Sequence, residues 1–120
     1  MTGYEIAREM SRKGTGERCF IRWWRKENDF VDYELVDTFL ANLAPDHEFS
    51  GFELLTAEQM WEELRRRVPK RVTLGQHHGE TVIRWLHRAE DGSMREETFP
   101  FAPEAIMTVF EEETHGDTMA

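Results

Sequence analysis

The sequence has little cysteine and no long apolar run, and each absence excludes a class of protein. Because Cys19 is the only cysteine, the chain cannot form an internal disulfide, which excludes a disulfide-stabilised secreted scaffold. No apolar run approaches the roughly 20 residues that cross a bilayer, and the first residues lack the apolar segment of a signal peptide. The sequence therefore predicts a cytoplasmic protein without membrane association.

Motifs for catalysis, metal binding or cofactor binding are also missing. There is no Gly-x-Ser-x-Gly motif, and residues 14–16 (Gly-Thr-Gly) lack the rest of a phosphate-binding loop. His77 and His78 are adjacent rather than at metal-ligand spacing, and Cys19 lies within a predicted strand, where a thiol usually acts as a small apolar side chain. We therefore assign no catalytic residue, no metal site and no cofactor.

What the chain does contain is enough apolar material for one core. It has 120 residues, of which 39% are hydrophobic and 12% aromatic. A chain of this length buries roughly two-thirds of its unfolded surface when it folds. We expect a single domain over residues 1–113 and a flexible tail over residues 114–120.

The charged residues alternate in sign along the chain. The net charge of −9 divides into +4 for residues 1–26, −11 for residues 27–63, +6 for residues 64–88 and −8 for residues 89–120. Residues 27–63 contain eleven acidic residues and no Lys or Arg. Such blocks either form ion pairs with one another on the folded surface or leave one face free to dock a basic partner.

Capping signals and apolar spacing predict helices in the first half. Thr2 and Glu5 have the spacing of a capping box, and Gly14 is a typical helix stop, which predicts a helix over about 3–13. Residues 17–26 alternate like a strand. Further elements are expected as a helix over about 32–43, a short edge strand over 52–55, and a helix that starts after Thr56 and ends before Pro69.

The second half predicts mainly strands. Residues 71–76, 81–89 and 94–101 are expected to form three strands joined by short turns, of which Asp91-Gly92 is a typical hairpin turn. Residues 104–113 fit either a helix or a strand. This order predicts an α+β fold, in which an antiparallel sheet made of the meander 71–101 and the strand 17–26 is covered by three mainly N-terminal helices.

The local motif with the clearest implication is Arg-Trp-Trp-Arg-Lys at residues 22–26. Neighbouring strand residues point to opposite faces, so Trp23 and Trp24 cannot share one face of a sheet. An exposed tryptophan beside Arg22 and Arg25 fits a protein interface or base stacking. The alternative is that helices cover both faces of the sheet, or that the outer tryptophan lies under a loop.

These observations favour a non-catalytic acidic binding protein, such as a small bacterial or phage inhibitor, immunity or regulatory factor. The expected contacts to a basic protein surface, which includes that of a nucleic-acid-binding protein, are Asp29, Asp32, Glu34, Asp37, Trp24, Arg22 and Arg25. Acidic excess disfavours direct nucleic-acid binding.

Two alternative functions remain open. One is a small-molecule-binding or enzymatic domain whose cavity, between sheet and helices, is lined by Trp23 or Trp24, Trp85 and Phe99 and holds His87 as an acid or base. The other is a homodimer that pairs along a sheet edge, with residues 17–26 as the candidate edge.

Overall fold

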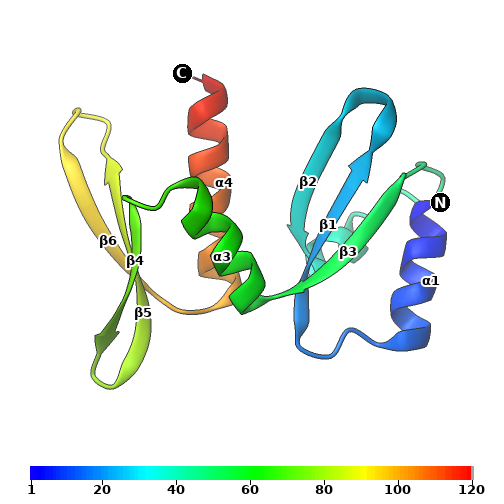
Figure 1. Ribbon diagram of the computed structural model, residues 1–120, viewed down its shortest axis with the longest axis horizontal. Coiled ribbons are helices and arrows are strands. Elements are labelled where there is room, and N and C mark those ends of the chain that lie inside the picture. The colour runs from blue at the N-terminus through cyan, green and yellow to red at the C-terminus, as the bar shows by residue number, and fades with distance from the viewer. Residues whose placement is uncertain (120) are drawn as a thin grey trace. The chain divides into compact units, whose positions relative to one another are not determined.

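The computed structural model describes residues 1–119, without the side chains of Asn28 and of residues 115–119. Its contacts divide into two compact units, Met1–Glu58 and Gln59–Ala120, and each carries a three-stranded antiparallel sheet (Figure 1). The fold is therefore α+β, as predicted. Within the part of the chain that the structure describes, no helix is long and apolar enough to cross a membrane.

Helix α1 (Gly3–Lys13) opens the first unit and is held at both ends by the predicted signals. The backbone N–H of Glu5 donates to Thr2 Oγ1 at 3.2 Å, and the Thr2 N–H donates to Glu5 Oε1 at 3.1 Å, which is a complete capping box. At the other end Gly14 has φ +76, a conformation that glycine adopts without strain.

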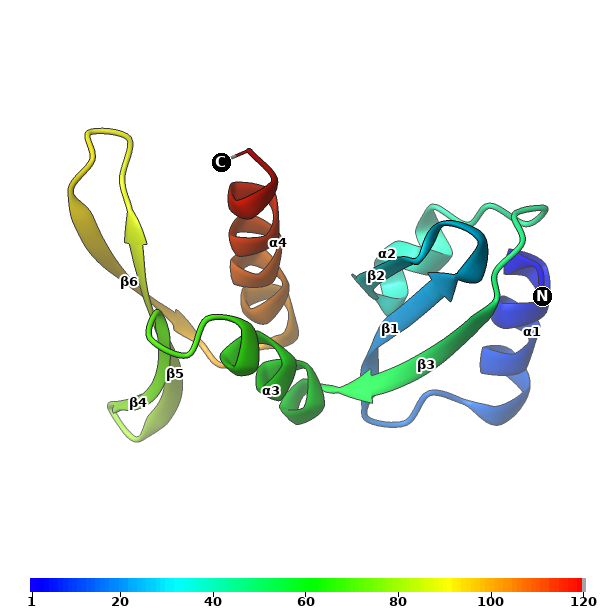
Figure 2. The ribbon, with the colours of Figure 1, turned by 45° about the horizontal axis from the view of Figure 1, so that its top comes forward.

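The sheet of this unit has the order β2-β1-β3, with β1 (Arg18–Arg25) between β2 (Phe30–Leu35) and β3 (Gly51–Thr56). Helix α1 and the short helix α2 (Val36–Ala41) flank it (Figure 2). Both helices pack on one face, where the buried side chains form the core of the unit. These are Ile6, Met10, Ile21, Val36, Phe39 and Phe49.

The segment predicted as a helix over 32–43 is instead a strand followed by a short helix. Residues 30–35 pair with β1 in register, with Tyr33 opposite Arg22 and Leu35 opposite Phe20. Only residues 36–41 are helical. The prediction was wrong because Tyr33 and Val36 have helical spacing but lie on either side of the junction between strand and helix.

Helix α3 (Ala57–Arg67) leads into the second unit, whose sheet is the predicted meander. Strands β4 (Val72–His77), β5 (Glu80–Arg88) and β6 (Met94–Pro100) pair in sequence order, all antiparallel. The turn before β6 contains Gly92 at φ +88. The meander and its turn are therefore confirmed.

Helix α4 (Pro103–Met119) resolves the last element as a helix, with Pro103 at its first position. It packs against β5, because the Trp85 Nε1 donates to Glu113 Oε1 at 2.8 Å and Arg71 donates to Glu113 Oε2 at 3.0 Å. The backbone of residues 114–119, which were predicted to be a flexible tail, continues this helix. Residue 120 lies outside the described residues. The tail and the single domain over residues 1–113 stay predictions.

Two details of the predicted sheet differ from the structure. Residues 17–26 do not join the meander, because β1 pairs with β2 on one side and with β3 on the other. The short stretch 52–55 lies at a sheet edge, as predicted. Because β1 is central, it has no free edge with which a second copy of the chain can pair.

Candidate protein-binding surface

The expected binding segment begins at the turn between β1 and β2. A short 3₁₀ helix (Lys26–Asn28) is followed by Asp29 at φ 51, and this left-handed residue reverses the chain. Aspartate is one of the few residue types other than glycine that tolerate this conformation. The turn leaves the side chains of Glu27 and Asp29 exposed.

Asp32 and Glu34 lie on β2 and are less available than predicted. They stand opposite Trp23 and Ile21 in the register, on the face that packs against the helices. The Trp23 Nε1 donates to Glu34 Oε2 at 2.7 Å, and the Tyr33 N–H donates to Asp32 Oδ1 at 2.9 Å. Both carboxylates are half-buried and serve bonds inside the first unit.

Several other acidic residues of the segment 27–63 are exposed and have no internal cation. Among the side chains that the structure describes, Glu27, Asp29, Asp37 and Asp46 form no ion pair or hydrogen bond. Other members of the segment do pair, since Glu48 lies 3.2 Å from the N-terminal ammonium and Glu53 lies 3.4 Å from Arg22. The alternating charge blocks thus neutralise each other only in part.

Carboxylates in the helices show how an ion pair within the protein changes the pKa of a glutamate. In α1 the bond from Lys13 lowers the pKa of Glu9, and in α3 the bond from Arg65 lowers the pKa of Glu62. In α3 the pairs have i, i+3 spacing, with Arg65 on Glu62 and Arg66 on Glu63. Helical neighbours thus account for Arg65 and Arg66, whereas the guanidinium carbon of Arg67 lies 4.9 Å from the Phe110 ring centroid.

The Arg-Trp-Trp-Arg motif forms two arginine–tryptophan pairs on opposite faces of β1. The guanidinium carbon of Arg22 lies 5.2 Å from the Trp24 ring centroid, and that of Arg25 lies 5.5 Å from the Trp23 ring centroid. The prediction that the tryptophans face opposite sides is confirmed. Neither is exposed, because both rings are half-buried.

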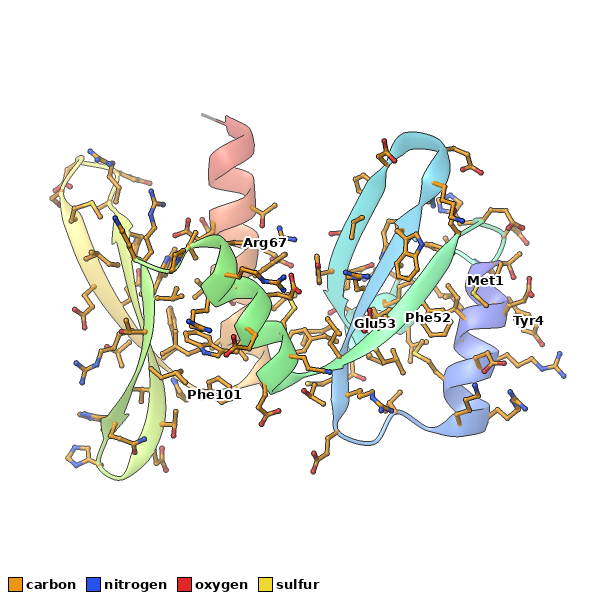
Figure 3. The ribbon with its side chains drawn as sticks, viewed as in Figure 1. Met1, Tyr4, Phe52, Glu53, Arg67 and Phe101 are labelled. Carbon is orange, nitrogen blue, oxygen red and sulfur yellow. The ribbon has the colours of Figure 1, made fainter. Side chains whose placement is uncertain are left out.

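Each arginine of these pairs is also held by a neighbouring polar group. Arg22 pairs with Glu53, which lies on β3 beside Phe52 (Figure 3). Arg25 Nη2 lies 2.9 Å from His47 Nδ1, and its guanidinium also lies over the ring of Phe49. On the Trp24 side, Gly51 makes room for the ring, since a Cβ there would come within 2.4 Å of it.

Two exposed apolar residues at the hairpin turn were not predicted. The side chains of Phe30 and Val31 are 46% and 50% exposed, directly after Asp29. Phe30 is ordered by Trp23, with ring centroids 5.3 Å apart. Alternation of apolar residues from Val31 through Tyr33 to Leu35 was the signal for this strand, but the helical spacing after Asp32 concealed it.

Of the residues expected to line an internal cavity, Trp85 and Phe99 lie in the second unit, with ring centroids 6.4 Å apart. Trp85 and His87 stack at 4.0 Å, and His87 Nε2 lies 2.7 Å from Glu97 Oε1. No cluster of three or more metal-ligating side chains occurs among the described residues.

The seven predicted contact residues are therefore distributed over both faces of the sheet of the first unit, the turn before β2 and helix α2. Asp29 and Asp37 are exposed, whereas Asp32, Glu34, Trp24, Arg22 and Arg25 are half-buried.

No protein-family model matches the sequence, and the searches of curated proteins and of solved structures found no significant match.

Proposed function

We propose that this protein binds a basic surface of another protein through residues 27–37 and acts without catalysis, as a cytosolic inhibitor, immunity or regulatory factor. The observation that carries the proposal is the set of exposed carboxylates of Glu27, Asp29 and Asp37, which have no ion-pair partner among the described side chains. A basic protein that itself binds nucleic acid is one partner of this kind.

The surroundings of these carboxylates support a protein partner over a diffuse cloud of counterions. Phe30 and Val31 add exposed apolar surface next to Asp29, and protein interfaces combine such surface with complementary charge. The 3₁₀ turn and the contact between Phe30 and Trp23 hold this surface in one conformation, which lowers the entropic cost of binding. Lys26 is the single cation of the turn.

Affinity capture from the source cell tests the proposal with charge-reversed chains. The triple variant Glu27→Lys, Asp29→Lys, Asp37→Lys is compared with a control of equal charge change, Glu90→Lys, Glu111→Lys, Glu112→Lys, whose positions are exposed in the second unit. Captured proteins are quantified by mass spectrometry at low and at high salt.

We expect basic proteins to be captured by the wild type and by the control at low salt. The triple variant and high salt should each reduce that capture by about 10-fold or more, because like charges then face each other across the interface. Equal capture by all three chains, or capture indifferent to salt, would contradict the proposal. Circular dichroism of the three chains shows that the comparison is made between folded proteins.

A further inference from the structure

Strand β4 is the first strand of the meander, and its outer edge has no partner strand. The Leu86 N–H donates to the Arg71 carbonyl at 2.7 Å, in register with the pairing of β4 and β5. Because hydrogen-bonded pairs alternate along antiparallel strands, the backbone N–H and C=O groups of Val72, Leu74 and Gln76 point away from β5. No other group of the described residues forms a hydrogen bond with them.

This edge lacks the charged residues that usually protect an exposed strand from pairing with another chain. Strand β4 contains no Asp, Glu, Lys or Arg, whereas β2, β3 and β6 each contain at least one acidic residue. At the middle of β4, Leu74 is 46% exposed, although it stands opposite the fully buried Ile83. The edge therefore offers both unpaired backbone groups and an exposed apolar side chain to a further strand.

We infer that β4 pairs antiparallel with β4 of a second copy of this chain, which joins the two meanders into one continuous sheet. A two-fold axis at Leu74 places Leu74 opposite its own copy and Val72 opposite Gln76 of the second copy. In this register each outward N–H group meets an outward C=O group, because the residues that face away from β5 stand opposite one another. The two Leu74 side chains lie on the same face, about 5 Å apart between Cβ atoms, and cover each other.

A second copy suits this edge because the charge beside it tolerates the pairing. Arg84 lies over Gly75, since a Cβ at Gly75 would be 2.7 Å from Arg84 Nε. Thr73 of the second copy stands opposite Gly75, so its hydroxyl lies beside this guanidinium as an acceptor. From the spacing and rise of strands, the two Arg84 guanidinium groups are about 8 Å apart, roughly one Debye length at physiological salt.

Salt distinguishes this dimer from the protein-binding surface of the first unit. Salt screens the repulsion between the two arginines and between two chains of net charge −9, so pairing of β4 should become stronger as the salt concentration rises. Binding through Glu27, Asp29 and Asp37 should instead become weaker. The two proposals therefore fail separately.

Analytical ultracentrifugation of the full chain tests the inference over a concentration series that reaches about 1 mM, because small interfaces are weak. We expect an equilibrium between monomer and dimer that shifts towards the dimer at high salt. Leu74→Lys places two ammonium groups opposite each other and should weaken association about 10-fold or more. Leu74→Pro removes the outward N–H without removing a hydrogen bond to β5, and should weaken association by a similar factor.

Leu86→Lys is the matched control, because it adds the same charge at an exposed position of the central strand β5. It should associate like the wild type, and circular dichroism shows that the compared chains are folded. Hydrogen exchange followed by NMR should show that the amides of Val72, Leu74 and Gln76 become protected as the protein concentration rises. A chain that stays monomeric throughout the series, or a dimer that Leu74→Lys leaves unchanged, would overturn the inference.

Discussion

The two units are similar in construction and charge but differ in how they use their acidic residues. Each has a three-stranded antiparallel sheet and 12 acidic residues, against 7 basic residues in Met1–Glu58 and 8 in Gln59–Ala120. In the first unit all basic residues precede residue 27, whereas in the second they are interleaved with the acids. Net charge therefore does not distinguish the units, and the order of charges does.

Both units contain the same type of hydrogen bond, from a tryptophan to a glutamate, which allows them to be compared directly. In each unit a strand tryptophan donates its indole N–H to a glutamate, from Trp23 to Glu34 at 2.7 Å and from Trp85 to Glu113 at 2.8 Å. Glu113 is only 8% exposed and Glu34 is half-buried. The second unit thus uses its acid inside the fold, while the first keeps its acids nearer to solvent.

The largest expected effect is the loss of the buried tryptophan. Trp85→Ala should lower the free energy of unfolding by about 3 to 5 kcal/mol, because it leaves a cavity and removes one donor from Glu113. Trp23→Ala, at a half-buried position, should cost about 2 kcal/mol. Urea denaturation of both variants measures the difference. Equal losses would mean that the two units do not differ in the burial of this pair.

A smaller change isolates the hydrogen bond itself. Trp85→Phe should cost about 1 to 3 kcal/mol and Trp23→Phe about 1 kcal/mol, since Glu34 regains water more easily than Glu113 when the donor is lost. The same denaturation experiment measures both. A larger loss for Trp23→Phe would show that the hydrogen bond to Glu34 stabilises the fold more than the hydrogen bond to Glu113.

The capping box of α1 predicts a pH effect in the first unit. Hydrogen bonds from the backbone and side chain of Thr2 lower the pKa of Glu5. The pKa is lower in the folded than in the unfolded state, so this stabilisation is present above about pH 4.3, the usual glutamate value, and is lost as the pH falls through the folded pKa. Glu5→Gln should flatten the fall in melting temperature below that pH, and an unchanged profile would contradict it.

The smallest effect on stability should come from the exposed carboxylates. Glu27→Lys should change the free energy of unfolding by less than about 0.5 kcal/mol. Asp29→Lys and Asp37→Lys should each cost about 1 kcal/mol, the first because lysine tolerates the left-handed φ of Asp29 less well and the second because Asp37 lies in the first turn of α2. Thermal denaturation measures all three. Losses of several kcal/mol would show that these acids stabilise the fold, and the contrast between the units would disappear.

Local signals in the sequence predicted the elements that depend on local bonds. The capping box at Thr2 and the stop at Gly14 defined α1, and the turn at Gly92 defined the last hairpin. The pairing of β1 was not predictable in this way, because its partners Phe30–Leu35 and Gly51–Thr56 are set by cross-strand packing and by the left-handed turn at Asp29.

The exposure of the residues in the candidate surface depends on strand pairing in the same way. The acidic stretch is visible in the sequence, but the strand pairing decides which acids remain exposed. It turns Asp32 and Glu34 toward the helices, brings Glu53 to Arg22, and leaves Phe30 and Val31 at the turn. Each arginine lies two residues from the tryptophan that it covers, so the two side chains share one face of the strand. The alternation of side chains along a strand predicts this arrangement.

Zero-length carbodiimide cross-linking of a captured complex tests the central claim most directly, because it joins a carboxylate only to an amine in contact with it. Peptide mapping by mass spectrometry then identifies which carboxylates of this chain are linked to lysines of the partner. The account predicts links at Glu27, Asp29 and Asp37. Links confined to exposed acids of the second unit, such as Glu111 and Glu112, would contradict it.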